Sequence, residues 1–539
     1  MKKNVQELLL DLIKAALKEC GFDDLDVYLD FPTDKRFGDF STNVALKLAK
    51  AHQRNPREVA SCIIESINRN ETGKSLIREI KAEGAGFINF YLSDDYYYQE
   101  LKEIISRGPE ALKINLGKGK KVLLEFVSAN PTGSLSVAHA RQAAVGDCLA
   151  NIMDFAGFKP KKEFYLNDKG NQINILGDSV NLRMKELDGQ AVEFPENYYQ
   201  GAYIYEIAKI AKDKNIKKED LGDFAGNYIL EIIKKELDDF GVKFDYWFSQ
   251  KELENSDRIE KVFEKLKDRG FLYEEDGALW FKSSAFGDDK DRVVIKSDKS
   301  MTYLAPDIAY HEDKFRRGFE WLVNMWGPDH HGYINRLKAS VQALGHDAKA
   351  ISIIIVQLAT IYRQGKPVQM STRRGEYITL REVLDEVGKD ASRFFFLMRK
   401  TSSHLDFDLD IAKKQSADNP VYYVQYAHAR ISSILRSSPV KLDKHADFAL
   451  LKEKEELALA KKIAQFSEII NVCVATLDPY MLTVYLQELA TSFHKFYDLH
   501  RVLGQSDELT KARLALCDAT KIALASGLDL LGVSKPEKM

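Results

Sequence analysis

Apolar residues recur at helical spacing at the start of the chain. Between residues 5 and 16 they fall at i, i+3, i+4 and i+7, which predicts an amphipathic helix that ends near Gly21. Two more helices and a short strand are then expected, at 43–52, 56–69 and 86–92. We therefore predict a small α+β domain over residues 1–112, with a linker rich in glycine near its end.

The hydrophobic pattern changes at residue 121. Residues 122–127 form a nearly continuous apolar run, which is typical of a buried parallel strand, and a helix from about 139 to 156 follows. Three further strands are expected, at 163–167, 321–326 and 351–356. This order predicts a doubly wound parallel sheet of Rossmann type over residues 113–400, with a mostly helical insertion at about 175–290.

From about residue 401 the pattern is helical throughout. One long helix is expected near 507–531, and another over 482–500 carries an apolar stripe. The residues of that stripe are Leu482, Tyr485, Leu486, Leu489, Phe493, Phe496 and Tyr497. The chain is thus predicted to be a multidomain α/β protein whose third domain, residues 401–539, is all-α.

Composition narrows the class of protein. Of the 539 residues 45% are apolar and 29% charged, as in ordinary soluble domains, and the net charge is −3. No apolar run approaches the roughly 20 residues needed to cross a bilayer, so we expect a cytoplasmic protein with no membrane partner. The five cysteines are scattered without C-x-x-C spacing, which disfavours a disulfide framework and a structural metal and fits a reducing compartment.

Three loops carry candidate chemistry. The first follows the first apolar strand, where His139 and Arg141 would offer donors to an anion at a helix N-terminus. The second, at 367–388, combines hydroxyl groups with two arginines and could clamp a polyphosphate. The third, at 326–333, has adjacent histidines but not the spacing of a metal motif, which favours a ligand-binding loop. A solvated helix end and a solvated basic turn remain alternatives for the first two.

An ordered set of motifs runs along almost the whole chain. They are E-F-V-S-A-N at 125–130, P-T-G-S-L-S-V-A-H-A-R at 131–141, Y-L-N-D-K-G-N-Q at 165–172, T-Y-L-A-P-D at 302–307, W-G-P-D-H-H-G-Y at 326–333, N-P-V-Y-Y-V-Q-Y-A-H-A-R-I at 419–431 and G-L-D-L-L-G-V at 527–533. In this order they closely resemble the arginyl-tRNA synthetases, a family of class I aminoacyl-tRNA synthetases. F-G-D-F-S-T-N at 37–43 resembles the domain that this family carries at its N-terminus.

The resemblance implies an arginine–tRNA ligase of protein synthesis. With ATP and Mg²⁺, arginine would form arginyl-adenylate and release pyrophosphate, and would then be transferred to the 3′-terminal adenosine of tRNA(Arg). The chain departs from the family at both signatures. Ser136 and Ala138 replace the first histidine and the glycine of H-x-G-H, and Gln369 and Thr372 replace the lysines of K-M-S-K. We expect one of the two arginines that follow to contact the pyrophosphate.

The choice of amino acid depends on charge. A guanidinium is a planar fork of donors that carboxylates match best. Glu125 lies in an apolar strand and needs a cation, either the substrate or an internal salt-bridge partner. Tyr303 and Asp307 are spaced to share one face of a helix beginning near Pro306. By the resemblance, the arginine pocket consists of Glu125, Ser128, Asn130, Tyr303, Asp307 and His331.

The resemblance also implies the remaining site residues. The catalytic residues would be Ser136, His139, Ser371, Arg373 and Arg374. ATP would contact Pro131, Thr132, Gly133, Ser136, His139, Gly327, Asp329, His330, Met370 and Ser371. The tRNA would contact Phe37, Asn43, Asn419, Tyr422, Tyr423, Tyr426, Arg430 and Met539. Aromatic faces suit splayed bases, although an aromatic stripe can also belong to the core.

Two alternatives remain open. The cysteinyl relative has a helical C-terminal domain of the same type but holds a zinc ion, which the scattered cysteines do not support. A non-catalytic paralogue that only binds tRNA is favoured by the altered signatures alone. We expect a monomer. We also expect no editing domain, because pairing with a charged group distinguishes arginine strongly from other amino acids.

Overall fold

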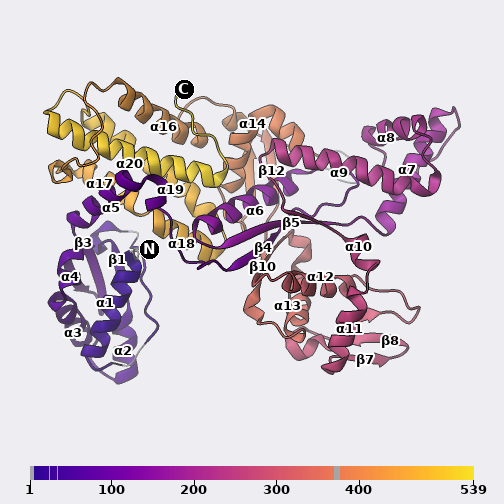
Figure 1. Cartoon of the computed structure of the whole chain (residues 1–539), viewed down its shortest axis with the longest axis horizontal. Coiled ribbons are helices and arrows are strands. Elements are labelled where there is room, and N and C mark those ends of the chain that lie inside the picture. Colours follow the sequence, from indigo (N-terminus) through magenta and orange to yellow (C-terminus); the bar gives the residue numbers. More distant parts are fainter. Residues whose placement is uncertain (1–4, 23–24, 33, 369–376) are drawn as a thin grey trace.

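The structure is a computed structural model that describes residues 5–22, 25–32, 34–368 and 377–539. Its N-terminal part packs helices against a three-stranded antiparallel sheet of order β1-β3-β2 (Figure 1). The elements are α1 (Val5–Glu19), β1 (Phe40–Thr42), α2 (Val44–His52), α3 (Pro56–Arg69), α4 (Glu71–Leu76), β2 (Ile77–Glu83), β3 (Phe87–Leu92) and α5 (Asp94–Arg107). The helices and the strand predicted in this region are confirmed.

A disulfide joins Cys20, the residue after α1, to Cys62 on α3, and their Cα atoms are 6.1 Å apart. The two residues are 42 positions apart in the sequence and meet because the helices pack together. Spacing alone could not reveal this pair, and the expectation of a chain without disulfides is wrong here. Cys148, Cys473 and Cys517 are buried thiols.

Five parallel strands form the central sheet in the order β11-β10-β4-β5-β6. They are β4 (Lys121–Glu125), β5 (Lys159–Leu166), β6 (Tyr246–Ser249), β10 (Trp321–Trp326) and β11 (Ile351–Ile355). In Figure 1, α6 (Val137–Phe155) covers one face, and α12 (Leu304–Arg316) and α13 (Ile334–Ala343) cover the other. The order reverses between β4 and β10, and such switch points are where these sheets bind ligands.

The strand register places polar side chains in one row across this sheet. Glu125 at the end of β4 lies opposite Asn324 on β10 and Glu163 on β5. The helix α6 packs closely over the same end of β4, because a Cβ at Gly146 would lie 2.3 Å from the Phe126 ring. The sheet thus holds three buried polar groups in one row at the end of β4.

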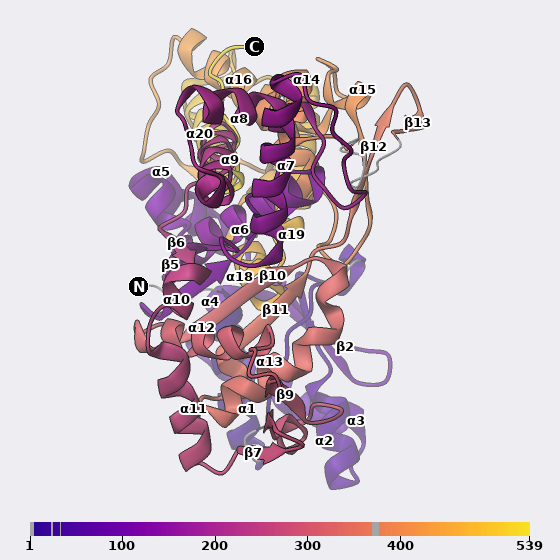
Figure 2. The same ribbon diagram turned by 90° about the vertical axis from the view of Figure 1, so that its right-hand side faces the viewer.

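The region predicted as one helical insertion consists of two units. The helices α7 (Asn171–Leu187), α8 (Ala202–Asp213) and α9 (Leu221–Asp239) precede β6, which belongs to the central sheet. After β6 come α10 (Gln250–Glu254), α11 (Arg258–Asp268), β7 (Leu272–Glu275), β8 (Ala278–Phe281) and β9 (Arg292–Ile295). Figures 1 and 2 place the two units on opposite sides of the central sheet. The region is mostly helical, as predicted, but the β7-β8-β9 sheet and the edge strand β6 were not expected.

The C-terminal third is mainly helical. A small sheet consists of β12 (Ala359–Arg363), β13 (Lys366–Pro367) and β14 (Leu405–Asp408), and α14 (Leu380–Leu397) lies between β13 and β14 in the sequence. The strand β14 corrects the all-helical prediction from 401. The helices are α14, α15 (Leu409–Ala412), α16 (Pro420–Ser437), α17 (Lys454–Ala464), α18 (Phe466–Thr476), α19 (Tyr480–Leu499) and α20 (Asp507–Leu531). Within the described ranges, no helix has the length and apolar character to cross a membrane.

Candidate active site

His139 lies in the first turn of α6, beside the N-cap residue Ser136. The Nδ1 atom of His139 accepts a hydrogen bond from the Ser136 N–H at 3.2 Å and lies 3.2 Å from Ser136 Oγ. Burial lowers the pKa of His139 to about 4, so the ring is neutral at neutral pH. Because Nδ1 accepts, the proton of the neutral ring is on Nε2, and His139 can act as an uncharged donor.

Arg141 lies on α6 and is fully buried. Its guanidinium donates to the backbone carbonyls of Gln357, Leu358, Lys400 and Ser403 at 2.7–3.3 Å. Burial lowers its pKa to about 10. The prediction that Arg141 offers a donor to a bound anion is therefore wrong, and the residue joins α6 to the loops that follow β11 and α14.

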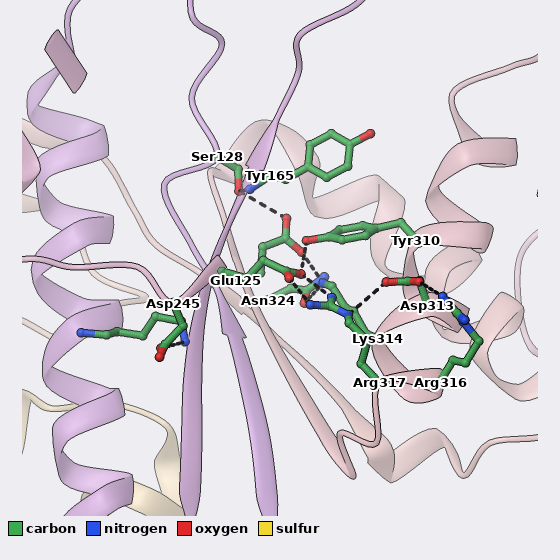
Figure 3. Close-up of polar contacts among 12 residues, drawn as sticks. Glu125, Ser128, Tyr165, Asp245, Tyr310, Asp313, Lys314, Arg316, Arg317 and Asn324 are labelled. Carbon is green, nitrogen blue, oxygen red and sulfur yellow. Dashed lines mark hydrogen bonds and ion pairs between the residues drawn. The ribbon is translucent and has the colours of Figure 1, made fainter. Parts of the chain in front are cut away.

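The loop between β4 and α6 begins with an unusual backbone. Val127 and Ser128 have φ angles of 67° and 40°, in the left-handed region that branched residues rarely adopt. Ser128 Oγ accepts a hydrogen bond from the Tyr165 N–H at 3.2 Å and donates to Glu125 Oε1 at 3.4 Å (Figure 3). Ser128 is thus held between β4 and β5.

The predicted ATP-binding residues at 131–133 continue this loop. Pro131 is buried, and Thr132 and Gly133 are half-buried. Asn130, predicted to contact arginine, accepts a hydrogen bond on Oδ1 from Asn167 Nδ2 at 2.8 Å. The loop therefore combines partly accessible peptide groups with side chains fixed by β5 and the residues after it.

The segment after β10 lies at the switch point of the sheet. A Cβ at Gly327 would lie 2.6 Å from Asp329 Oδ1, so glycine makes room for the turn. Asp329 and His330 form an ion pair at 3.4 Å when the histidine is protonated, and His331 beside them is exposed. Among the described residues, no group of three or more His, Cys, Asp or Glu is placed to hold a metal ion.

Glu125 is paired with Lys314 of α12, and both side chains are buried (Figure 3). Lys314 Nζ donates to Glu125 Oε2 at 2.5 Å and to Asn324 Oδ1 at 3.3 Å. The internal salt bridge, which the sequence left open for Glu125, is therefore present. A contact between Glu125 and arginine stays a prediction.

The polar row continues on both sides of this pair. Glu163 accepts two hydrogen bonds from Arg317, at 2.5 and 3.0 Å. Asn324 Nδ2 donates to His311 Nε2 at 2.8 Å, and His311 Nδ1 donates to the Asp307 carbonyl at 2.8 Å. Burial lowers the pKa of His311 and keeps it neutral, as this pattern of one donor and one acceptor requires. The network fixes the backbone that carries Asp307.

Asp307 is half-buried near Glu125. Burial raises the pKa of Asp307 to about 7, the Glu125 charge adds to the rise, and the Tyr333 hydroxyl and Lys314 oppose it. Within the described part of the chain, Tyr333 Oη itself has no well-formed hydrogen bond. Two carboxylates therefore act on one region, which is the arrangement that a cationic ligand would need.

Tyr303 lies further out than expected. The helix α12 begins at Leu304, two residues before Pro306, and Tyr303 is its N-cap. The Asp307 N–H reaches the Tyr303 carbonyl at 3.4 Å, but the Tyr303 side chain is 80% exposed. The two residues share a helix turn, and a Tyr303 contact with arginine stays a prediction.

The second signature falls outside the described residues, and with it the predicted site residues Met370, Ser371, Arg373 and Arg374. The segment that follows it lies against the first signature. Leu380 N–H donates to the Leu135 carbonyl at 2.8 Å, and Val137 N–H donates to the Ile378 carbonyl at 3.3 Å. The start of α14 is thus bound to the start of α6.

A groove of about 780 Å³ lies between α16, α19 and the C-terminal tail. Three predicted tRNA residues, Tyr426, Arg430 and Met539, line it. The Arg430 guanidinium lies 4.7 Å from the Tyr426 ring centre and 5.0 Å from that of Tyr497, and it donates to Tyr426 Oη at 2.8 Å. A cation held over aromatic faces is a surface on which an unpaired base can stack.

The other predicted tRNA residues differ in accessibility. Tyr422 and Tyr423 are half-buried on α16, and Phe37 is 43% exposed in the N-terminal part. Asn43 is the half-buried N-cap of α2. Asn419 is buried, caps α16, and donates to two backbone carbonyls, so a tRNA contact would have to break these bonds.

Sequence reasoning missed three side chains around these loops. Lys314 lies in a charged stretch typical of a solvated helix. The only signal for its role was that a buried Glu125 carboxylate needs a positively charged partner. Tyr203 and Tyr377 donate to the carbonyls of Thr132 and Ser134. These contacts join distant segments, and no motif signalled them.

Comparisons with known proteins cover the chain in three consecutive parts. Residues 7–92 match the arginyl tRNA synthetase N terminal domain, residues 100–405 match the tRNA synthetases class I (R), catalytic domain, and residues 424–539 match the DALR anticodon binding domain. These matches do not support the cysteinyl alternative. They follow the same order as the three predicted domains.

Individual relatives match over almost their full lengths. The arginine–tRNA ligase of Geobacter sp. (strain M21) is 47% identical over 528 residues, 95% of each chain. That of Carboxydothermus hydrogenoformans is 44% identical over 555 residues, 99% of this chain and 98% of the relative. The Thermus thermophilus arginyl-tRNA synthetase structure has the same fold, with a TM-score of 0.79 at 21% identity over 99% of this chain and 100% of that one. The chain belongs to the arginyl-tRNA synthetase family, the class I arginine–tRNA ligases.

Proposed function

We propose that this chain joins arginine to tRNA(Arg) at the site formed by β4, α6 and α12. Arginine would first react with ATP to give arginyl-adenylate and pyrophosphate, and the arginyl group would then pass to the 3′-terminal adenosine. The observation that carries the proposal is that two carboxylates, Glu125 and Asp307, lie close enough to interact at the end of β4, which borders the switch point of the sheet.

The two carboxylates have different roles in this proposal. Lys314 already neutralises Glu125, so the buried pair adds little net charge. Asp307 is half-buried and has a pKa of about 7, so it is only partly ionised at neutral pH, and a guanidinium would replace the remaining proton with a bidentate ion pair. Recognition of arginine therefore rests mainly on Asp307, and lysine, which lacks the planar fork, would bind less well.

ATP would lie along the 131–139 segment. The arginine carboxylate attacks the α-phosphorus, a P–O bond forms, and the bond to the leaving pyrophosphate breaks. His139 would donate from Nε2 to a phosphate oxygen as a neutral ring, because its pKa is about 4. We propose that ATP enters with Mg²⁺, whose charge offsets that of the triphosphate. Arg373 or Arg374 would bind the pyrophosphate in place of the missing lysines.

The tRNA would bind along the C-terminal and N-terminal parts. The groove beside Arg430 would hold an anticodon base, stacked on Tyr426 or Tyr497. Phe37, which is exposed, would contribute to a second contact near the outer corner of the tRNA. We further propose that the protein works as a monomer in the cytoplasm.

Aminoacylation of total tRNA with labelled arginine tests the proposal. The wild-type chain should charge tRNA, and Asp307→Ala should raise the KM for arginine steeply while ATP binding is kept. Asp298→Ala, at an exposed turn, is the matched control and should behave as wild type. A chain that binds tRNA but yields no labelled product would instead be the non-catalytic paralogue that the altered signatures favour. Activation must be assayed with tRNA present, because the resemblance implies that this step needs it.

A further inference from the structure

Two tyrosine hydroxyl groups hold the loop that leads from β4 to α6. Tyr203, on α8, donates to the Thr132 carbonyl at 2.7 Å. Tyr377, which follows the second signature segment in the sequence, donates to the Ser134 carbonyl at 2.9 Å. The loop is therefore anchored from the helical insertion on one side and from the second signature region on the other.

The two hydroxyl groups converge on Gly133. A Cβ at this position would lie 3.3 Å from Tyr377 Oη and 3.5 Å from Tyr203 Oη. Burial raises the pKa of both tyrosines. Tyr377 adds to the rise for Tyr203, and Glu236 and Glu382 add to it for Tyr377, so both hydroxyls stay protonated and act as donors. The absence of a side chain at Gly133 lets both reach the backbone closely.

Further hydrogen bonds hold the loop where it meets the start of α6. Glu236, buried on α9, accepts a hydrogen bond from the Leu135 N–H. Leu380 N–H donates to the Leu135 carbonyl at 2.8 Å. Peptide groups at residues 132, 134 and 135 are thus held by α8, by α9, and by residues 377–380 at and just before the start of α14.

We propose that Tyr203 and Tyr377 are positioning residues for ATP, acting through the 131–135 loop. The inference rests on the proposed function, because it assigns ATP to this loop. Neither hydroxyl touches ATP in this proposal. Each fixes one carbonyl, and together they set the direction of the peptide groups that lead to His139. A loop released at one carbonyl would sample other conformations, and ATP would have to select the productive one.

The test uses Tyr203→Phe, Tyr377→Phe and the double variant, each of which removes only hydroxyl groups. Arginine-dependent exchange of labelled pyrophosphate into ATP is measured with tRNA present. Each single variant should raise the KM for ATP about three- to tenfold, the effect of one lost hydrogen bond, and leave the KM for arginine within about twofold. Tyr228→Phe is the matched control, because its hydroxyl donates to Glu206 at 3.0 Å within the same insertion.

Hydrogen–deuterium exchange gives a readout besides activity. Peptides that cover 129–140 should exchange faster in both single variants and not in Tyr228→Phe. If wild type shows no arginine-dependent exchange, the proposed function fails. If wild type is active but the variants keep the wild-type KM for ATP, or if the KM values for ATP and arginine rise equally, the positioning role is overturned.

Discussion

Arginine should bind more tightly as the pH rises from 6 to 8, because Asp307 must lose its proton to pair with a guanidinium. Burial raises the pKa of Asp307 to about 7. At pH 6 about one chain in eleven would then carry the ionised carboxylate, and at pH 8 about ten in eleven. Since only the ionised form binds well, the apparent Kd should fall about tenfold over this range and change little above it.

Other groups around Asp307 do not mask this effect. His311 on α12 has a pKa far below the range and stays neutral, and the pKa values of Tyr165 and Tyr333 lie far above it. Glu125 on β4 and Lys314 on α12 form a closed ion pair. Among these groups, Asp307 is the one whose proton release should accompany arginine binding between pH 6 and pH 8.

Isothermal titration calorimetry with arginine at pH 6, 7 and 8 measures this dependence. Paired buffers of different ionisation enthalpy count the protons, and about 0.9 proton per arginine should be released at pH 6 against about 0.1 at pH 8. Asp307→Asn is the control, with weak binding that does not vary with pH. The reasoning is refuted if wild-type affinity is flat across the range, or if the Asn variant keeps the slope.

Three further outcomes are expected. Lys314→Met leaves the buried Glu125 carboxylate unpaired and should lower the free energy of unfolding by about 3–5 kcal/mol in urea titrations, and adding Glu125→Gln should restore part of the loss. Arg373→Ala or Arg374→Ala should lower the rate of pyrophosphate exchange about 10²-fold or more if that arginine holds the pyrophosphate, and two unaffected variants would reject the assignment. Reduction of Cys20–Cys62 should destabilise the N-terminal part by roughly 4 kcal/mol, seen as a lower Tm with dithiothreitol, and an unchanged Tm would contradict this.

Much of the fold could be predicted from continuous apolar runs. The strand at 321–326 has the predicted bounds because it is a continuous apolar run. The helix at 507–531 also has the predicted bounds, because its apolar residues recur at helical spacing and Gly532 ends it. The strand β6 was missed because it lies at the sheet edge, is only four residues long and is at most half-buried. Edge strands need little apolar character, so their sequence resembles that of a loop.

The site was predictable in its residue types but not in its pairings. Glu125 signalled a need for a cation, yet its partner Lys314 is 189 residues away and resembles a solvated lysine in the sequence. Arg141 seemed suited to bind an anion, and packing turned it inward to backbone carbonyls instead. Such pairings depend on which loops meet in three dimensions, and the local spacing of residues along the sequence does not reveal this.

The inward guanidinium of Arg141 has a consequence for how this protein can diverge. Its acceptors are main-chain oxygens, which every amino acid supplies. Substitutions at Gln357, Lys400 and Ser403 would therefore leave these hydrogen bonds in place. The arginine itself has no such freedom, because lysine offers a single nitrogen where four oxygens must be reached. Variation among homologues should therefore be wide in these loops and narrow at position 141.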